Sequence, residues 1–234
     1  MRTLRLGVAL GLALLLAACA TNTHKQITEL SRTQERAPRV LLMPVDVELM
    51  ELTTFGRTEP KADWTEAGTR HVSTALADYN VERDLQLVPF DLDKMPDGVR
   101  DELNQLIKLH GAVGNSILLH QYLEPAKLPS KQGKFDWSLG PQVKRLKETT
   151  DADYALFFFM RDSYSSGGRV AIMMVGALMG VAVQGGVQVG FASLVDLNDG
   201  NVVWFNRLMR PQGDLRSAQG AKESTAMLLT GLPK

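Results

Sequence analysis

The sequence predicts an α/β domain with a mostly parallel mixed sheet, flanked by helices and ending in an antiparallel C-terminal hairpin. Three observations support this prediction. Short apolar runs that fit strands alternate with longer segments of helical periodicity, which is the order of α/β proteins. One run, Tyr154 to Met160, is apolar at every position, as expected for a central strand that is buried on both faces. The dipeptide Asp199-Gly200 separates the last two strand candidates and favours a tight hairpin.

Residues 1–18 have the features of a targeting signal and are therefore excluded from the predicted fold. Arg2 and Arg5 give a basic start, residues 6–15 are apolar, and small residues precede Cys19. The tetrapeptide Leu16-Ala-Ala-Cys19 resembles the lipobox of bacterial lipoproteins. The resemblance implies cleavage before Cys19, thioether lipidation of its sulfur, and acylation of the new amine, typically with palmitate.

Cys19 is the only cysteine, so an exported form of this chain has no internal disulfide to make. The alternative is an ordinary secretory leader or an uncleaved membrane helix in which Cys19 is incidental. Against an uncleaved helix, the apolar region is shorter than the ~20 residues needed to span a bilayer. Ala20 stands where inner-membrane lipoproteins often carry Asp, so the same resemblance implies an anchor on the periplasmic face of the outer membrane.

The charge balance excludes one class of partner. Removing the leader takes away two of the 26 basic residues and none of the 26 acidic ones, which leaves a net charge of minus two. Nucleic-acid-binding proteins usually carry a basic excess or stripe, so nucleic acid is not an expected partner. Residues 19–38 are polar and predict a flexible lipid-anchored tether, and residues 39–234 have the length of a single periplasmic domain.

The first strand candidate runs from Val40 to Val47 and is apolar on both faces. Pro44 has no amide donor, so we expect it at an edge or at the strand's end. Residues 48–61 fit a loop, with residues 51–55 as a candidate for a short extended piece. From Trp64 to Tyr79 the apolar residues recur at helical spacing, which predicts a helix packed on the first strand.

Residues 85–91 predict a second strand, and Asp97 is a candidate cap for the next helix. The apolar side of that helix includes Leu103, Leu106 and His110. Its pattern loosens over residues 111–116, where we expect an interruption before an apolar segment resumes.

The run from Val170 to Val195 contains no charged residue and divides into two parts. Residues 169–183 lack the alternation of a strand and predict a helix. Residues 187–197 alternate and predict a strand, which a turn at residues 198–201 joins to a partner strand at 202–209. Residues 215–229 predict the final helix.

Three interpretations of the helix at residues 169–183 remain open. It belongs to its own core, it packs on a partner protein or a second copy, or it contacts a membrane. Gly176 and Gly180 form an edge that permits close packing, and methionines are adaptable contact residues. As a helix the segment spans about 21 Å, less than the ~30 Å hydrocarbon core of a bilayer. The candidate partner-contact or membrane-contact residues are Met173, Met174, Gly176, Leu178, Met179 and Gly180.

Three segments together resemble a group of bacterial envelope domains. Residues 40–46 look like the opening strand of that group, residues 152–158 like its middle strand, and residues 192–204 like its hairpin. The group includes the amino-terminal domain of the Tol translocation protein, curli-secretion lipoproteins and lipoprotein activators of penicillin-binding proteins. The resemblance implies a non-enzymatic binding or assembly role. Curli-secretion lipoproteins form pores from long alternating strands, and this run does not alternate before Val187, so a pore is not implied.

The residues that commonly carry catalysis do not form a recognisable motif. The four histidines lack metal-binding spacing, and no second cysteine is present. Ser163, Ser165 and Ser166 lie in a Gly-rich segment without a nucleophile elbow or a phosphate loop. We therefore predict no catalytic residue, no metal ligand and no cofactor.

The sequence thus predicts a lipid-anchored, non-catalytic envelope protein that binds an envelope partner and supports envelope assembly or maintenance. An alternative is a homo-oligomeric component of secretion or export. A cell-wall hydrolase is a third, less favoured hypothesis.

Overall fold

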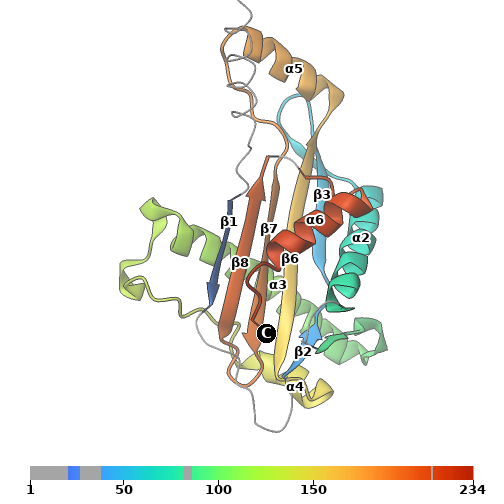
Figure 1. Cartoon of the computed structure of the whole chain (residues 1–234), viewed down its shortest axis with the longest axis vertical. Coiled ribbons are helices and arrows are strands. Elements are labelled where there is room, and N and C mark those ends of the chain that lie inside the picture. Colours follow the sequence, from blue (N-terminus) through green and yellow to red (C-terminus); the bar gives the residue numbers. More distant parts are fainter. Residues whose placement is uncertain (1–20, 27–37, 82–85, 212, 234) are drawn as a thin grey trace, which may run out of the picture.

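A computed structural model of the chain describes residues 21–26, 38–81, 86–211 and 213–233 (Figure 1). The predicted signal peptide, Cys19 and most of the predicted tether lie outside these residues. The described strands are β1 (Thr21–Gln26), β2 (Arg39–Leu42), β3 (Asp46–Leu52), β4 (Thr58–Pro60), β5 (Gln86–Pro89), β6 (Tyr154–Ser165), β7 (Gln188–Asp196) and β8 (Val202–Arg210). The described α-helices are α2 (Ala62–Val81), α3 (Asp97–Tyr122), α4 (Lys144–Thr150), α5 (Gly167–Leu178) and α6 (Ala218–Leu228).

The strands form one mixed sheet in the order β1-β8-β7-β6-β2-β5, with β3 paired to β6 beyond β2, and β4 paired to β3. Strand β2 is parallel to β5 and β6, and β3 is parallel to β6. The predicted α/β class and the antiparallel hairpin of β7 and β8 are confirmed. Antiparallel pairing extends further than this hairpin, because β6 also pairs antiparallel with β7 and β1 with β8.

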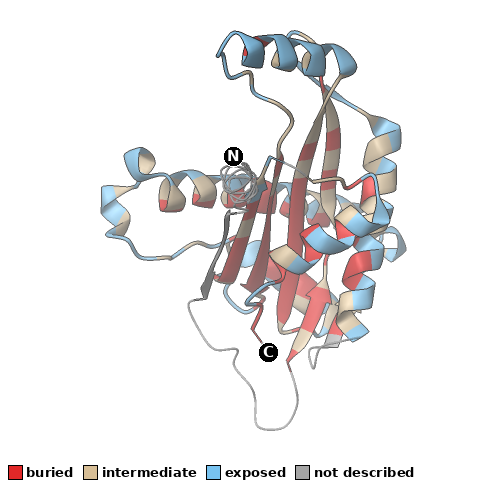
Figure 2. Cartoon of the chain, turned by 45° about the horizontal axis from the view of Figure 1, so that its top comes forward, coloured by how far each residue is buried: buried red, intermediate tan, exposed pale blue. Residues whose placement is uncertain are grey.

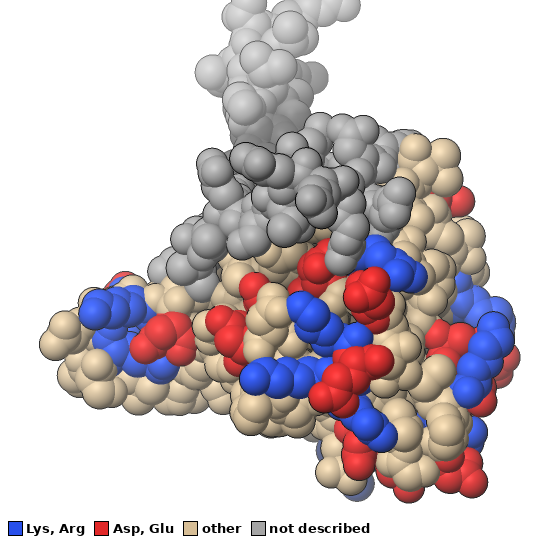
Figure 3. Space-filling view, turned by 90° about the horizontal axis from the view of Figure 1, so that it is seen from below, with Lys and Arg blue, Asp and Glu red and all other residues tan. Residues whose placement is uncertain are grey.

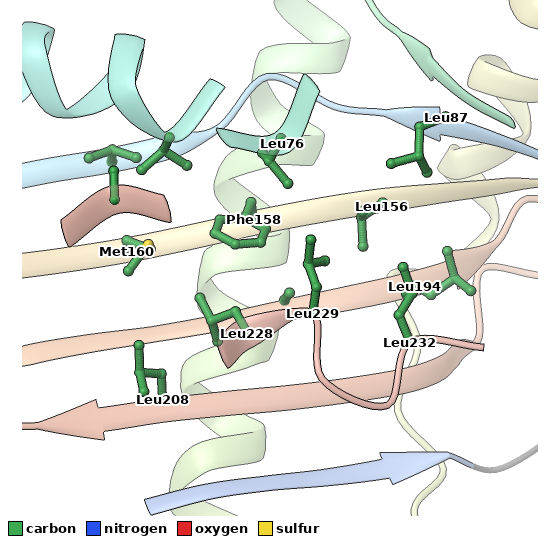
Figure 4. Packing of buried hydrophobic residues seen from close by; sticks show 14 of the residues in the cluster. Leu76, Leu87, Leu156, Phe158, Met160, Leu194, Leu208, Leu228, Leu229 and Leu232 are labelled. Carbon is green, nitrogen blue, oxygen red and sulfur yellow. The ribbon is translucent and has the colours of Figure 1, made fainter. Parts of the chain in front are cut away.

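The central strand β6 is buried on both faces, as its composition predicts. Phe158 and Met160 point into the layer between the sheet and helices α2 and α6 (Figure 4). Phe157 and Phe159 belong to the opposite layer, which α3 and α4 cover. Because successive side chains of a strand alternate between faces, an unbroken apolar run supplies both cores at once.

The first strand differs from the prediction. Residues 40–47 do not form one strand, because β2 ends at Leu42 and β3 begins at Asp46. Leu42 pairs with Leu156 and Asp46 with Phe159. The three residues 43–45 between β2 and β3 therefore lie opposite only two residues of β6, 157 and 158. Pro44 lies in this bulge, where its missing amide donor disrupts no ladder hydrogen bond.

The predicted loop at residues 48–61 is wrong over much of its length. Strand β3 continues to Leu52 and turns back into β4. Lys61 forms an ion pair with Glu51 at 2.7 Å. The polar residues that suggested a loop belong to the more exposed side of an edge hairpin, whose pairing depends on backbone groups.

Helix α3 crosses the second face of the sheet without the expected interruption at residues 111–116. Gly111 and Gly114 are buried in this segment because they lie directly against aromatic rings. A Cβ added at Gly114 would lie 2.0 Å from Cε2 of Phe191. The glycines therefore shorten the distance between helix and sheet, and tertiary packing outweighs their low helix propensity. Asp97 is the first residue of α3, but the cap position is Pro96 and no side chain caps it.

Strand β1 lies within the segment that the sequence predicts as a tether. It pairs antiparallel with β8, with Thr21 opposite Met209 and Gln26 opposite Trp204. A polar segment can form an edge strand, because strand pairing uses backbone groups and does not require apolar side chains. The polar composition of this segment therefore gives no indication of a strand. Its direction places Thr21 at the end of the sheet where β8 ends.

Substituting Gly114→Ala should lower the free energy of unfolding by roughly 1–3 kcal/mol, because the added methyl group overlaps the buried ring of Phe191. The matched control is Gly98→Ala in the first turn of the same helix, where a Cβ would meet nothing within 4 Å. That control should leave stability unchanged or raise it by up to about 1 kcal/mol. Urea unfolding of both variants provides the measurement, and equal effects would contradict the packing explanation.

The buried His110 should make stability depend on pH. Its Nε2 lies 2.9 Å from Ser193 Oγ, its ring stacks on Phe157, and burial lowers its pKa from 6.5 to about 3. Below pH 6.5 the unfolded chain binds a proton at His110 and the folded chain does not. The contribution of the neutral, buried His110 to the free energy of unfolding is therefore complete above pH 6.5. It is lost as the pH falls toward 3, by roughly 1.4 kcal/mol per pH unit.

The variant His110→Gln removes this titration. Between pH 7 and pH 5, the unfolding free energy of the unsubstituted chain should therefore fall by about 2 kcal/mol more than that of the variant. Urea titrations at the two pH values measure this difference. An equal pH dependence in both proteins would show that His110 does not account for it.

Candidate functional site

Helix α5 stands at one end of the sheet, outside both cores. It follows β6 directly, and Ser166 caps it by accepting a hydrogen bond from the backbone N–H of Arg169 at 3.2 Å. In Figure 1 the helix lies above the ends of the strands, and Figure 2 shows it lying crosswise there with mostly exposed residues. Residues 166–187, which comprise the cap, the helix and the return segment to β7, are called the arm below.

The outer surface of the arm is apolar and uncovered. Leu178 is 89% exposed, Met179 75% and Met174 64%. Only Gly176 is buried within α5. Of the three interpretations from the sequence, the one that places this helix in its own core is therefore wrong. Contact with a protein and contact with a membrane remain.

Polar groups hold the base of the arm in place. The guanidinium of Arg169 donates to the carbonyl oxygen of Gln184 from Nε at 3.0 Å and from Nη2 at 2.7 Å. Ser165 Oγ accepts from the N–H of Gly186 at 3.0 Å, and Ser163 Oγ accepts from the N–H of Val187 at 2.9 Å. The bonds of Ser163 and Ser165 fasten the return segment to β6, and those of Arg169 join it to α5. The serines of the Gly-rich segment thus have structural roles.

The two glycines of the predicted packing edge act within the chain. A Cβ at Gly176 would lie 2.9 Å from the carbonyl oxygen of Val181, and the N–H of Val181 donates to Gly176 O at 2.8 Å. Gly180 has φ +73°, a left-handed conformation that ends helices. The helix therefore stops at Leu178 and reverses, instead of continuing to Val183 as predicted.

The predicted contact residues divide into two groups. Met174, Leu178 and Met179 lie on the outer surface of the arm. Met173 faces inward, where its sulfur accepts from Ser165 Oγ at 3.7 Å, and Gly176 is buried beneath the return segment. Gly180 is exposed at the turn. The prediction missed four exposed apolar side chains, although a helix without a polar face should have indicated them. They are Val170, Ile172, Val175 and Val181.

His71 and His120 also have structural partners. His71 Nδ1 lies 3.1 Å from the carbonyl oxygen of Leu215, and His120 Nδ1 lies 2.7 Å from that of Ala126. Within the described ranges, no three His, Cys, Asp or Glu side chains cluster as a metal site would require.

A buried polar network links β6, β7, β8 and the segment before α6. Asp162 accepts hydrogen bonds from Tyr164 Oη at 2.5 Å and from Gln188 Nε2 at 2.7 Å. Gln188 in turn accepts from Arg210 Nε at 2.7 Å and from Ser224 Oγ at 2.9 Å. Burial raises the pKa of Asp162 and of Tyr164. Each of these groups has a partner inside the fold, and the network fastens α6 to the sheet.

Two surface hollows are lined by residues that pair with one another. One, of about 470 Å³, contains Arg161, which binds Asp46 at 2.8 Å and Glu48 at 3.2 Å. The other, of about 460 Å³, lies between α3 and α4 and contains Arg145 and Glu102, whose charged atoms are 3.7 Å apart. Figure 3 shows the end opposite α5, where basic and acidic side chains are interspersed. Neither hollow concentrates one sign of charge.

Among the described residues, none of the helices has both the length and the apolar composition needed to cross a membrane.

No family model and no curated protein sequence matches this chain. Among solved structures it is similar to the PelC dodecamer from Paraburkholderia phytofirmans, with 14% identity, 90% of this chain and 96% of that chain covered, and a TM-score of 0.40. A single-residue variant of the same dodecamer gives 15% identity, coverage of 91% and 96%, and a TM-score of 0.41. The C-terminal domain of LpoB from Salmonella enterica gives 14% identity, coverage of 78% and 90%, and a TM-score of 0.29. Similarity this low supports no inference about function.

Proposed function

We propose that this chain is a lipid-anchored, non-catalytic envelope protein that supports envelope assembly or maintenance by binding outside its own domain. The observation that carries the proposal is the apolar, uncovered outer surface of α5. The lipobox-like tetrapeptide ending at Cys19 supports an anchor, by resemblance on the periplasmic face of the outer membrane.

The energetics of exposure support a binding role for the arm. Burying one side chain such as Leu178 or Met179 is worth roughly 1.5–3 kcal/mol, so leaving several in water is costly for a monomer. Contiguous exposed apolar patches on soluble domains typically mark interaction sites. In the structure the domain does not cover this surface, and hydrogen bonds hold the return segment to α5 and to β6.

The internal partners of the titratable groups support the non-catalytic part of the proposal. An acid, base or nucleophile needs a free reactive atom facing a cleft. His110, Asp162 and Ser165 instead make hydrogen bonds that hold elements together. Turnover assays on peptidoglycan fragments test this part directly, and measurable hydrolysis would contradict it.

Burial of α5 in the envelope can be measured by thiol accessibility. The variants Leu178→Cys and Val81→Cys place a thiol at the last residue of a helix, at positions 89% and 87% exposed in the isolated chain. In native envelopes, the thiol at position 178 should react several-fold more slowly with a bulky maleimide than the thiol at position 81. Both should react fully after denaturation. Equal rates in native envelopes would contradict the proposal.

Lipidation of Cys19 can be tested by metabolic labelling with an alkyne fatty acid. The unsubstituted chain should incorporate the label and begin at the modified cysteine, as mass spectrometry of its N-terminal peptide would show. The variant Cys19→Ala should incorporate none, because it lacks the sulfur that accepts the lipid. A mature chain that starts elsewhere without label would show an ordinary secretory leader.

A further inference from the structure

We infer that α5 rests in the same lipid leaflet that holds the anchor on Cys19, so that the protein attaches to the membrane at two points. This inference rests on the proposed function, because it identifies the surface that the arm binds. The occupant is phospholipid, and the attachment at α5 is non-covalent.

The strand register places the anchor and the arm at the same end of the sheet. Thr21 of β1 pairs with Met209, which is followed by Arg210 opposite Gln188 of β7. Gln188 pairs with Asp162, near the end of β6 that leads into α5. Figure 1 shows the start of β1 on the side of the molecule toward α5.

Chain length then limits how far the lipid attachment lies from this end. Cys19 precedes Thr21 by two residues, which reach about 7 Å at most when fully extended. The membrane surface must therefore pass close to the start of β1. An element that projects from the same end, as α5 does, meets that surface first.

Other exposed apolar side chains gather at this end. Phe55 lies in the turn between β3 and β4, and a Cβ added at its neighbour Gly56 would lie 3.5 Å from the guanidinium of Arg169. Met209 is exposed at the end of β8. With the seven from the arm, nine of the twelve large exposed apolar side chains in the described part of the chain lie here. Separate elements thus contribute to one apolar end.

The shape of the apolar surface favours lipid over a protein groove. At 100° per residue, the exposed apolar side chains from Val170 to Met179 cover an arc of about 200° around the helix. A helix that docks on one protein face needs an apolar stripe of about 100°. Acyl chains, in contrast, adapt to any arc. The inward side is occupied by Arg169 and Gly176, which contact the return segment, and by Met173, which contacts Ser165 of β6.

The orientation of α5 suits the surface of a leaflet. The helix has 12 residues, or about 18 Å, and lies crosswise over the end of the strands (Figure 2). Helices of interfacial proteins bury their apolar face about 5–10 Å into the boundary between headgroups and acyl chains. With the strands along the membrane normal, α5 lies in the membrane plane, and Phe55 provides an aromatic contact beside it.

The test uses the full lipidated chain with one added thiol, at Leu178→Cys, at Met174→Cys, or at the control Val81→Cys. Each thiol is labelled with an environment-sensitive fluorophore, and the protein is reconstituted in vesicles of phosphatidylethanolamine and phosphatidylglycerol. Labels at positions 178 and 174 should shift to shorter emission wavelengths and lose most of their fluorescence when the lipids carry brominated acyl chains. The label at position 81 should do neither. Unchanged thermal unfolding midpoints control for folding.

Two results would overturn the inference. Labels at 178 and 174 that remain water-exposed at every protein-to-lipid ratio would show that lipid does not cover α5. Labels that become protected only at high protein density, with energy transfer between copies, would identify a second copy as the occupant.

The two proposals fail in distinguishable ways. Protection of position 178 in native envelopes together with exposure in pure lipid would leave the proposed function standing, with a protein as the partner. Exposure in both would overturn both.

Discussion

The burial of β6 on both faces is the constraint on which the rest of the structure depends. Its twelve residues pair with β2 and β3 along one edge and with β7 along the other, so the strand is enclosed on four sides. Phe157 and Phe159 attach α3, while Phe158 and Met160 attach α2 and α6. Strand β6 is held in place by its neighbours on both sides. Because α5 follows β6 directly, the position of the end of β6 determines where α5 lies.

The two cores and the apolar outer surface of the arm lie in different parts of the chain. Both cores lie on the sheet, whereas Gly176 is the only buried residue of α5, and polar hydrogen bonds hold the arm at its base. A residue such as Leu178 belongs to neither core, so we expect a change there to affect the proposed binding more than the folding of the domain. A residue such as Phe191 has the opposite effect, because α3, β6 and β8 all pack on its ring.

The sequence predicts the elements whose signal lies in a few consecutive residues. It does not predict features that depend on contacts with residues distant in the chain. The strands β6 and β7 and the Asp199-Gly200 turn are predicted from the residues themselves, and each is confirmed. The alternation that predicts β7 does not extend to its burial, because residues on both faces of this strand are buried. The continuity of α3 through Gly114 is not visible, because it depends on a ring 77 positions away in the chain, that of Phe191. The exposure of α5 is hidden for a related reason. A helix of Val, Ile, Met and Leu has the same composition whether it lies in a core or stands bare, so only the fold around it can distinguish the two.

The direction of β1 determines which end of the sheet carries the start of the described chain. Because β1 is antiparallel to β8, Thr21 lies at the apolar end. The opposite end, where α4 lies (Figure 1), carries interspersed basic and acidic side chains (Figure 3), and α4 contains the ion pair of Arg145 with Glu148. Had β1 run parallel to β8, the proposed anchor would lie at the charged end, opposite α5. With the observed direction, the proposed anchor and the apolar helix lie at one end and would share a single low-polarity environment, while the paired charges at the other end would stay hydrated. The direction of one edge strand is thus what would allow the two proposed attachments to act together.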